Sequence, residues 1–504
     1  MKKFNKDKYL KKLKLKRFWQ NNSRYFYIGV PCILCGILGI YFAYSKFFVT
    51  QEDAVVQTSV GNFVYGDVII NNYVNGQYTV EAPALGNGYR VDKIVCDNGA
   101  VGEWNARDWG PTISNVTKRS KCNIYFVDIV DKINVGNVAV PLDYYGLCPT
   151  VNADGTATVT EVESQYGYLC KAKDAYGDSY YYRGNVTNNY VKFGRWSDDA
   201  PDIVRGYYSE SSTSYEEYSS LEECQSASSY NVNCTLISNA GKEMYWRIVR
   251  INGNGTVRVI YDGTSAHANG ESSDDRQIGT SAFNSNRNDN VYVGYMYGKT
   301  GASNYADAHA NTNNSTIKTY LDTWYENNIK GTTNEQYIAD NVFCNDRSFA
   351  SDNSGTGAGT SKTYYRWNNF ANNSNNNKMM LTCPQKNDAF TVNDTNKGNG
   401  ALTYGVGLIT SDEAVLAGGW NSNNSNYYLY SGQSYWTMSP FYFYNSFFPL
   451  WGNGAREYHV NLVVDTSIFG DVSDTYGARP VFNLESEVLL QGTGTASDPY
   501  HLAS

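Results

Sequence analysis

The stretch that decides the fold is YWRIVRINGNGTVRVIYDG, from Tyr245 to Gly263. It contains two runs of β-branched and aromatic residues, which are residue types that favour strands. The tetrapeptide Asn-Gly-Asn-Gly at positions 252–255 separates the runs and is typical of the turn in a β-hairpin. Similar runs precede it, SYYYRG at 179–184 and NYVKFG at 189–194. We therefore predict a head built around an antiparallel sheet.

Two segments carry helix signals. Residues 314–315 can cap a run in which apolar side chains recur at helical spacing as far as Ile329. Thr410 and Glu413 form a capping box before a shorter run, which the glycines at 418–419 would end. We predict that both helices are structural and that their aromatic residues belong to the core, which gives the fold class α+β.

The composition excludes several classes of protein. Of the 504 residues, 18% are charged and 15% are aromatic, whereas disordered chains are rich in charge and poor in aromatics. The mean hydropathy of −0.49 excludes a multi-spanning transporter. The length allows roughly two to four domains.

The net charge of −8 combines two unlike pieces of chain. Residues 1–24 hold ten Lys or Arg and one acid, and residues 25–45 follow without any charged side chain. A run of about 20 apolar residues suffices to cross a bilayer as a helix. We predict a basic cytoplasmic tail (1–24), a single transmembrane helix (25–45) and, because basic flanks stay inside, an extracellular remainder in a single-pass cell-membrane protein.

Two other interpretations of this end stay open. A signal peptide cleaved near Ala43 and Ser45 would release the rest of the chain. The basic tail could also be an arm that binds nucleic acid. Beside a membrane span, however, it is expected to contact anionic membrane lipid, so we predict no nucleic-acid partner.

Cysteine usage agrees with export. Cys32 and Cys35 fall in the predicted span, and the other eight cysteines form sequential couples that predict four local disulfides in an oxidising exterior. Eight cysteines allow roughly a hundred pairings, so only proximity selects these couples. None of the eight forms a C-x-x-C and the four histidines are scattered, so no metal site is predicted. The couples are Cys96 with Cys122, Cys148 with Cys170, Cys224 with Cys234, and Cys344 with Cys383.

Changes in composition divide the exported part of the chain. Strand-like runs with Asn-Gly turns follow a short polar stalk and predict a small all-β spacer domain. A segment rich in Ser, Glu and Tyr interrupts the head. The predicted segments are the stalk 46–60, the small β domain 61–127, a connector 128–165 and the head 166–504, with an insertion at 195–243 and a variable window at 441–474.

The sequence carries no catalytic signature. It has no H-E-x-x-H, G-x-S-x-G, P-loop or dinucleotide fingerprint, so we expect no enzyme. Asp412 and Glu413 are adjacent carboxylates, but acids at a helix start complement the helix dipole. The segment DTNKGNG at 394–400 offers oxygen ligands for calcium, yet it lacks the spaced acids of an EF-hand loop. We predict no cofactor, with calcium in this loop as the open alternative.

The C-terminal end carries the most informative pattern. YWTMSP at 435–440 and GARPVFNL at 477–484 flank a variable middle. This end resembles the C-type-lectin-like domains of bacterial surface proteins related to formylglycine-generating enzymes, which read W-x-x-S-P and then G-x-R-P-x-x-x-L. The resemblance covers about residues 166–504 and implies a C-type-lectin-like head. The matching residues are Trp436, Ser439, Pro440, Gly477, Arg479, Pro480 and Leu484.

Several members of this fold are target variable proteins of diversity-generating retroelements, in which a reverse transcriptase rewrites adenines, including those of asparagine codons. The resemblance therefore implies a diversified window between two fixed motifs. Residues 284–426 contain 29 Asn in 143 positions, whereas the window 441–474 contains 3 in 34. The window also lacks Lys, Gln and Met, which adenine changes in an asparagine codon do not produce. Trp451 and Glu457 are also residues that such changes do not produce, so both would have to be invariant positions.

The physical character of the window also favours binding. It holds nine aromatic residues in 34 positions, and aromatic anchors beside polar groups give contact area at low entropic cost. The alternative is that they are core residues, and we expect about half to be buried, in particular Trp451 and the segment 459–464.

We therefore predict a membrane-anchored extracellular ligand-binding protein, a diversified receptor or adhesin of a bacterial surface. Its partner would be an extracellular protein, a glycan or a phage surface. The alternatives are a surface enzyme related to formylglycine-generating oxidases, which hold copper with a cysteine pair, and a structural envelope protein. The predicted contact residues are Phe441, Phe443, Tyr444, Ser446, Phe447, Phe448, Arg456, Tyr458, His459, Asp465, Ile468, Phe469 and Asp471.

Overall fold

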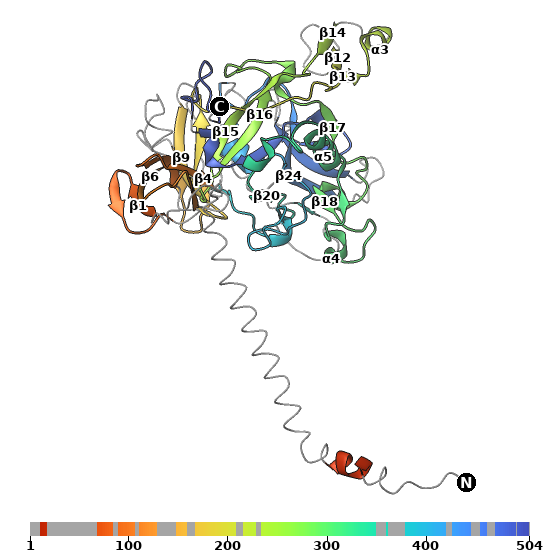
Figure 1. Cartoon of the computed structure of the whole chain (residues 1–504). Coiled ribbons are helices and arrows are strands. Elements are labelled where there is room, and N and C mark those ends of the chain that lie inside the picture. Colours follow the sequence, from red (N-terminus) through yellow and green to blue (C-terminus); the bar gives the residue numbers. More distant parts are fainter. Residues whose placement is uncertain are drawn as a thin grey trace, which may run out of the picture. The chain divides into compact units, whose positions relative to one another are not determined.

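The protein, shown as a computed structural model in Figure 1, divides into two compact units. One unit comprises residues 1–70 and 94–123, and the larger unit comprises residues 71–93 and 124–504. The structure describes residues 11–17, 68–83, 89–105, 110–128, 148–158, 167–207, 215–227, 233–348, 359–360, 378–419, 426–444, 454–460, 469–489 and 491–502.

The predicted hairpin lies in the middle of a sheet in the larger unit. Strands β15 and β16 pair antiparallel through the turn at 252–255, as predicted. Gly253 is required in this turn, because a Cβ there would lie 2.4 Å from the backbone nitrogen of Gly177. The sheet has the order β28-β16-β15-β10-β9, and β11 also pairs with β15. Its strands are β9 (Gly167–Asp174), β10 (Gly177–Gly184), β11 (Tyr190–Arg195), β15 (Glu243–Ile251), β16 (Val257–Gly263) and β28 (Val481–Leu484).

A second sheet contains both motifs of the C-terminal end. Its order is β17-β27-β24-β25-β26, and β21 pairs with β24. The long strand β24 begins at the W-x-x-S-P motif and runs into the predicted window. The register shifts on both sides of Pro440, which has no N–H to donate to the ladder. Its strands are β17 (Thr280–Ala282), β21 (Gly359–Thr360), β24 (Tyr435–Tyr444), β25 (Gly454–Val460), β26 (Phe469–Asp471) and β27 (Thr475–Gly477).

The segment predicted as an insertion contains a sheet of its own, with the order β13-β12-β14. Arg205 of β12 connects it to the rest of the unit. Its side chain is fully buried, lies 3.1 Å from a carboxylate oxygen of Glu217 and donates to the backbone oxygen of Asp274. The insertion is therefore fixed by a buried cation. Its elements are β12 (Ile203–Tyr207), β13 (Tyr215–Tyr218), α3 (Leu221–Ser226) and β14 (Asn233–Ile237).

Helix α5 (Thr316–Asn328) closes the main aromatic core. It begins at Ser315, whose side chain accepts the amide of Lys318, so the predicted cap is confirmed. The ring centroid of Trp324 lies 6.4 Å from that of Trp246 and 6.0 Å from that of Phe482. Large aromatic side chains contribute heavily to core stability when buried.

The remaining elements of the larger unit are short. Helix α7 (Ser411–Leu416) begins at the predicted capping box, in which the side chains of Thr410 and Glu413 bond each other's backbone amides. The other elements are α4 (Tyr305–Ala308), β7 (Thr150–Val151), β8 (Ala157–Thr158), β18 (Met296–Tyr297), β19 (Asn313–Asn314), β20 (Phe343–Cys344), β22 (Lys378–Met379) and β23 (Ala389–Phe390).

The N-terminal strands form tight hairpins. β1 (Val68–Val74) and β2 (Gln77–Thr79) meet at the turn 75–76, where both residues have positive φ, as a type I′ turn requires. β4 (Val101–Asn105) pairs with β5 (Gly110–Ser114). The ends of β3 (Tyr89–Cys96) and β6 (Ser120–Asp128) are joined by a disulfide between Cys96 and Cys122.

The structure joins the eight described cysteines in the four predicted disulfides. Each pair is separated by fewer than 40 residues, and the local spacing therefore selected the correct partners. The S–S distances are 2.00 Å for Cys96–Cys122, 1.99 Å for Cys148–Cys170, 1.95 Å for Cys224–Cys234 and 2.07 Å for Cys344–Cys383.

The predicted fold class and localisation require correction. The described residues are mostly β-sheet with few helices, and none of their helices is long and apolar enough to cross a membrane. This finding contradicts an α+β protein with a single transmembrane helix and the single-pass membrane localisation. The prediction rested on the length of the uncharged run 25–45 and on its basic flank, and the run also contains a proline, three glycines and four tyrosines. The run itself lies outside the described residues.

Candidate functional site

The second sheet brings separate parts of the predicted window together. Arg456 of β25 lies opposite Tyr442 of β24 on one side and opposite Asp471 of β26 on the other. Tyr458 lies opposite Phe469. Directly opposed residues in antiparallel strands are close enough for their side chains to interact. Predicted contact residues from three chain segments thus occupy adjacent register positions.

The other predicted contact residues fall into two groups. Within the sheet, Phe443 lies opposite Ala455, Tyr444 opposite Gly454 and His459 opposite Trp436. The second group lies outside the described residues, and its members are Ser446, Phe447, Phe448, Asp465 and Ile468.

Phe441 and Asp471, both predicted contact residues, have partners within the protein. Phe441 is only 9% exposed and packs in a cluster with Tyr181, Val415 and Leu416, so its side chain belongs to the core. Asp471 forms an ion pair with Arg287, whose side chain is 48% exposed. Sequence reasoning missed Arg287, because it lies 184 residues from Asp471 along the chain.

The motif that precedes the window is buried. Trp436 is completely buried, and its indole N–H donates to the backbone oxygen of Ser281 at 2.8 Å. Its ring packs edge-on against Tyr476, with centroids 4.7 Å apart. Ser439 is 3% exposed and its hydroxyl accepts the amide of Ser411 at 2.9 Å. These residues hold the base of β24 and are not available to a ligand.

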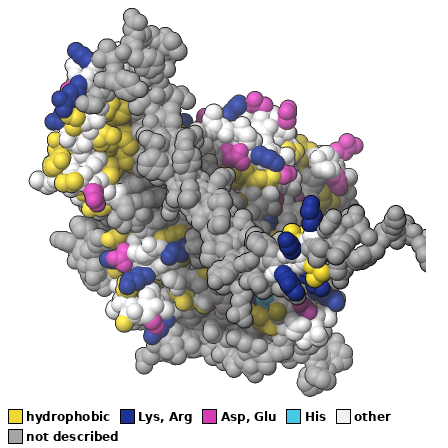
Figure 2. Space-filling model, turned by 60° about the horizontal axis from the view of Figure 1, so that its bottom comes forward, with side chains coloured by type: hydrophobic (Ala, Val, Ile, Leu, Met, Phe, Trp, Pro, Cys, Tyr) yellow, Lys and Arg dark blue, Asp and Glu magenta, His cyan; other side chains and the backbone are white. Residues whose placement is uncertain are grey.

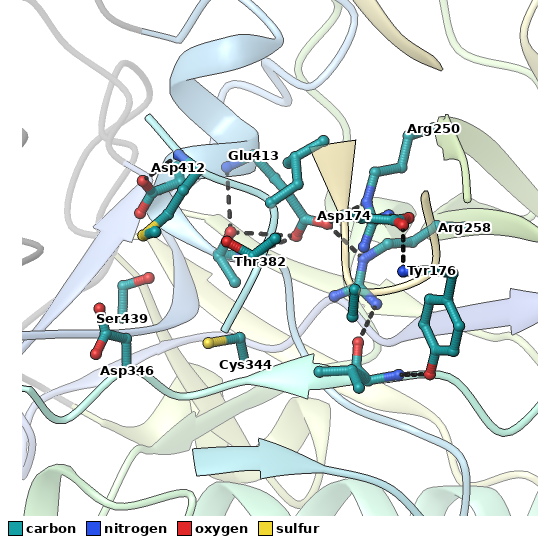
Figure 3. Close-up of a pocket in the computed structure, with 15 residues that line it drawn as sticks. Asp174, Tyr176, Arg250, Arg258, Cys344, Asp346, Thr382, Asp412, Glu413 and Ser439 are labelled. Atoms are coloured by element: carbon teal, nitrogen blue, oxygen red, sulfur yellow. Dashed lines mark hydrogen bonds and ion pairs between the residues drawn. The ribbon is translucent and has the colours of Figure 1, made fainter. Parts of the chain in front are cut away.

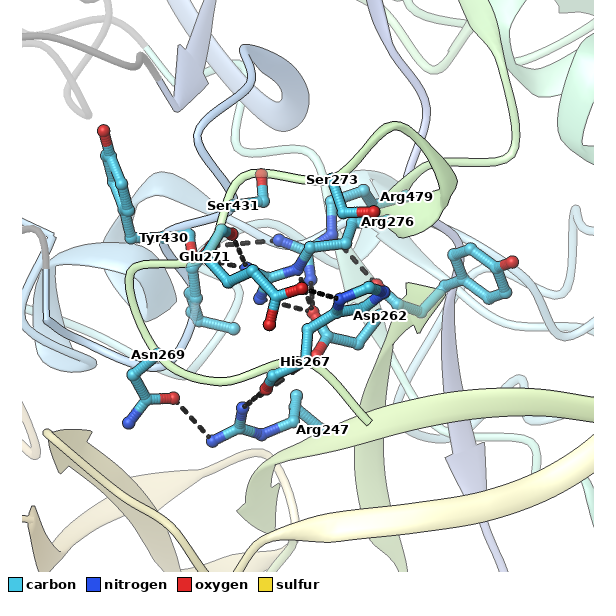
Figure 4. Close-up of polar contacts among 12 residues, drawn as sticks. Arg247, Asp262, His267, Asn269, Glu271, Ser273, Arg276, Tyr430, Ser431 and Arg479 are labelled. Carbon is cyan, nitrogen blue, oxygen red and sulfur yellow. Dashed lines mark hydrogen bonds and ion pairs between the residues drawn. The ribbon is translucent and has the colours of Figure 1, made fainter. Parts of the chain in front are cut away.

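A buried charge cluster joins Asp262 of β16 with three arginines (Figure 4). One oxygen of Asp262 accepts Nη2 of Arg276 at 2.7 Å and Nη2 of Arg479 at 2.7 Å. Its second oxygen lies 3.9 Å from Nη1 of Arg247. All four side chains are fully buried. A single carboxylate therefore compensates three guanidinium groups.

The cluster fixes both ends of the window. Arg479, just after β27, donates to the backbone oxygen of Leu429 at 2.9 Å. Arg276 donates to the backbone oxygen of Tyr430 at 3.0 Å. Leu429 and Tyr430 lead into β24, so Asp262 connects the chain before the window with the chain after it. Arg479 is the arginine of the G-x-R-P motif, and the sequence did not reveal this structural role.

A small pocket lies beside the base of β24 (Figure 3). Arg250 donates to Asp174 at 2.6 Å and to Glu413 at 3.0 Å, and Arg258 lies 2.7 Å from the same Glu413 oxygen. Burial would raise the pKa of Glu413, but the two guanidinium groups hold it below its usual value. The cavity measures about 20 Å³, which is room for one water molecule and not for a metabolite.

The loop considered for calcium is a turn held by its own backbone. The carboxylate of Asp394 accepts the amides of Asn396 and Lys397 at 2.8 and 3.0 Å. Asp340 accepts three further amides from residues 392–394. Within the ranges that the structure describes, no three His, Cys, Asp or Glu side chains gather closely enough to bind a metal ion.

Several hydrophobic side chains are individually exposed elsewhere in the chain. Of the described residues, most large hydrophobic side chains that are exposed lie between positions 69 and 101, and Tyr78 is 60% and Val80 83% exposed. Figure 2 shows one face of the molecule, on which hydrophobic side chains lie among Lys and Arg side chains. Residues 69–101 are far in sequence from the predicted window 441–474.

No protein-family model, curated protein or solved structure matches this chain.

Proposed function

We propose that this protein is a binding protein that recognises an extracellular protein, a glycan or a phage surface through the sheet β24-β25-β26. The observation that carries the proposal is the register of these strands, in which Arg456 opposes Tyr442 and Asp471, and Tyr458 opposes Phe469. Aromatic and arginine residues dominate the energetics of recognition surfaces. The register brings residues from three segments of the window to neighbouring positions of one sheet.

The buried supports of this sheet favour a binding role. A binding surface needs residues held by packing and hydrogen bonds from behind. Trp436, Asp262 and Arg479 are completely or almost completely buried and hold the base and both ends of the window. Substitutions within 441–474 can then change the surface while the ends stay in place.

Diversification of the window is part of the proposal. Its scarcity of asparagine and its position between two fixed motifs support a target variable protein of a diversity-generating retroelement. A near-copy of the coding segment for 441–474, differing only at adenines and lying beside a reverse transcriptase gene, is the expected genomic arrangement. Sibling chains whose differences fall outside this window would contradict it.

The alternative of a copper-dependent oxidase has less support. Formylglycine-generating oxidases bind copper through a pair of cysteine thiolates. All eight cysteines in the described part of the chain are joined in disulfides, so none of them offers such a pair. A structural envelope protein would not depend on the identity of residues in the window, and the binding experiment below separates the two.

The experiment compares the full chain with a triple variant on arrays of glycans and bacterial surface proteins. The variant carries Arg456→Ala, Tyr458→Ala and Phe469→Ala. We expect it to lose the array features that the wild type binds, because the three positions are adjacent in register. The matched control is Tyr78→Ala, which removes an aromatic side chain that is 60% exposed elsewhere. Equal binding by the triple variant and the wild type would refute the proposal.

A further inference from the structure

The loop between β16 and β17 closes on a buried histidine (Figure 4). Nδ1 of His267 lies 2.9 Å from Oε1 of Glu271, and Nε2 lies 2.8 Å from Oδ1 of Asp275. The histidine side chain is 7% exposed. We call these three residues the histidine clasp.

The two carboxylates of the clasp favour a doubly protonated, positively charged imidazole ring. A carboxylate oxygen only accepts, so Nδ1 must carry a hydrogen to bond Glu271. The contact between Nε2 and Asp275 is an ion pair, which a positively charged ring favours. A neutral ring would turn a lone pair toward one of the carboxylates. Burial alone lowers the pKa of His267, but the bonds and charges of Asp275 and Glu271 raise it above its usual value.

The groups around the clasp are mostly committed to other partners. Asp262 adds negative charge near His267 but is bonded to Arg276 and Arg479. The backbone oxygen of His267 accepts the hydroxyl of Tyr190 at 2.6 Å. It also lies 3.5 Å from Nη1 of Arg247. The carboxylates of the clasp are thus the direct partners of the ring.

Asp275 ties the loop to its own ends. Its Oδ2 accepts both the amide and the hydroxyl of Thr264 at 2.8 Å, and its Oδ1 accepts the hydroxyl of Ser273 at 2.5 Å. Gly263 allows this closure, because a Cβ there would lie 2.8 Å from Nε2 of His267. Residues 264–276 therefore form one closed loop around the imidazolium.

The same loop contacts the chain that leads into β24, residues 429–433. Arg276 donates to the backbone oxygen of Tyr430 at 3.0 Å. Ser272 donates to the backbone oxygen of Gly432 at 3.5 Å. Asp274 accepts the side-chain amide of Gln433 at 2.8 Å. Order in the loop thus supports order at the start of the strand that carries the window.

We propose that the histidine clasp is a pH-sensitive latch on residues 429–433. The latch is closed while His267 carries two protons. Loss of one proton turns a ring lone pair toward Glu271 or Asp275, which removes the attraction to that carboxylate and loosens the loop 264–276. Any effect of the latch on ligand binding rests on the proposed function, whereas the pH dependence of the loop itself does not.

The direction of the pH dependence follows from the raised pKa. A histidine whose pKa is higher in the closed state than in the open state favours closure at low pH. Closure is fully supported below about pH 6.5, the usual value for histidine, and is lost as the pH rises through the raised pKa of His267.

The first test is hydrogen exchange of the full chain at about pH 6 and about pH 9, corrected for intrinsic exchange rates. We expect residues 429–433 of the wild type to exchange several-fold faster at the higher pH. In His267→Gln this difference should disappear, and in the control His501→Gln it should persist. Equal protection of the wild type at both pH values, or an unchanged difference in His267→Gln, would overturn the latch.

A second measurement uses only the wild-type chain. The ring resonances of His267, assigned among the four histidines of the chain, are followed by NMR as the pH is raised. We expect a titration midpoint above about 6.5, and a midpoint at or below that value would overturn the proposal. Neither test uses a ligand, so a failure of array binding would count against the proposed function alone.

Discussion

Replacing Asp262 with asparagine should destabilise the larger unit more than any exposed charge substitution. The side chain is fully buried and bonds Arg276 and Arg479, each at 2.7 Å, with Arg247 at 3.9 Å. Asparagine keeps the size of the side chain but removes the charge. It leaves three buried guanidinium groups without their common carboxylate.

The magnitude follows from the cost of leaving a charge unpaired in a protein interior. Removing one partner of a buried ion pair typically costs about 3–5 kcal/mol. Because three cations share Asp262, we expect Asp262→Asn to lie at the upper end of this range. The double variant Asp262→Asn/Arg276→Met restores the net charge of the cluster, so it should be less destabilised than the sum of the two single variants.

Urea unfolding followed by tryptophan fluorescence measures the change, since Trp246, Trp324 and Trp436 all lie in the main core. The control is Asp198→Asn, which removes an ion pair with Arg195 whose side chains are 52% and 74% exposed. Exposed pairs contribute about 0–1 kcal/mol. If Asp262→Asn and the control shift the free energy of unfolding equally, the cluster does not support the fold as described.

Three further outcomes follow from the structure. Burial and a nearby guanidinium lower the pKa of His309 to about 3. The contribution of His309 to stability is therefore present above about pH 6.5 and is lost as the pH falls toward 3. Melting temperatures should fall less over this pH range in His309→Gln than in the wild type. The double variant Cys344→Ser/Cys383→Ser opens a loop of 39 residues and should lower the free energy of unfolding by about 4 kcal/mol, whereas a loss below 1 kcal/mol would contradict this. Arg287→Ala breaks a partly exposed ion pair with Asp471. It should lower the free energy of unfolding by less than about 1 kcal/mol and should alter array binding. Unchanged binding would exclude Arg287 from the recognition surface.

Features that depend on neighbouring residues could be predicted from the sequence. The hairpin turn at 252–255, the cap at Ser315 and the capping box at Thr410 all appear where the local chemistry requires them. The four disulfides were also accessible, because each joins cysteines adjacent in the order of the chain. Local hydrogen bonding and short loop closure explain these successes.

The supports of the candidate site could not be predicted in this way. Asp262 meets Arg479 at a sequence separation of 217 residues, and no periodicity connects the two. The burial of Phe441 was equally hidden, because the run 441–444 is aromatic at every position and alternation gives no face. The bulges beside Pro440 then change the register, and that depends on the partner strand.

The turn at 252–255 also bears on how the protein ages. Asn-Gly sequences deamidate when the glycine nitrogen attacks the asparagine side chain, which requires both groups to move freely. Here Asn252 is 2% exposed and the amide of Gly253 donates to Asp174 at 3.0 Å, against a neighbouring strand. The Asn-Gly turn at 75–76 is exposed. In stored protein, deamidation should therefore be faster at Asn75 than at Asn252.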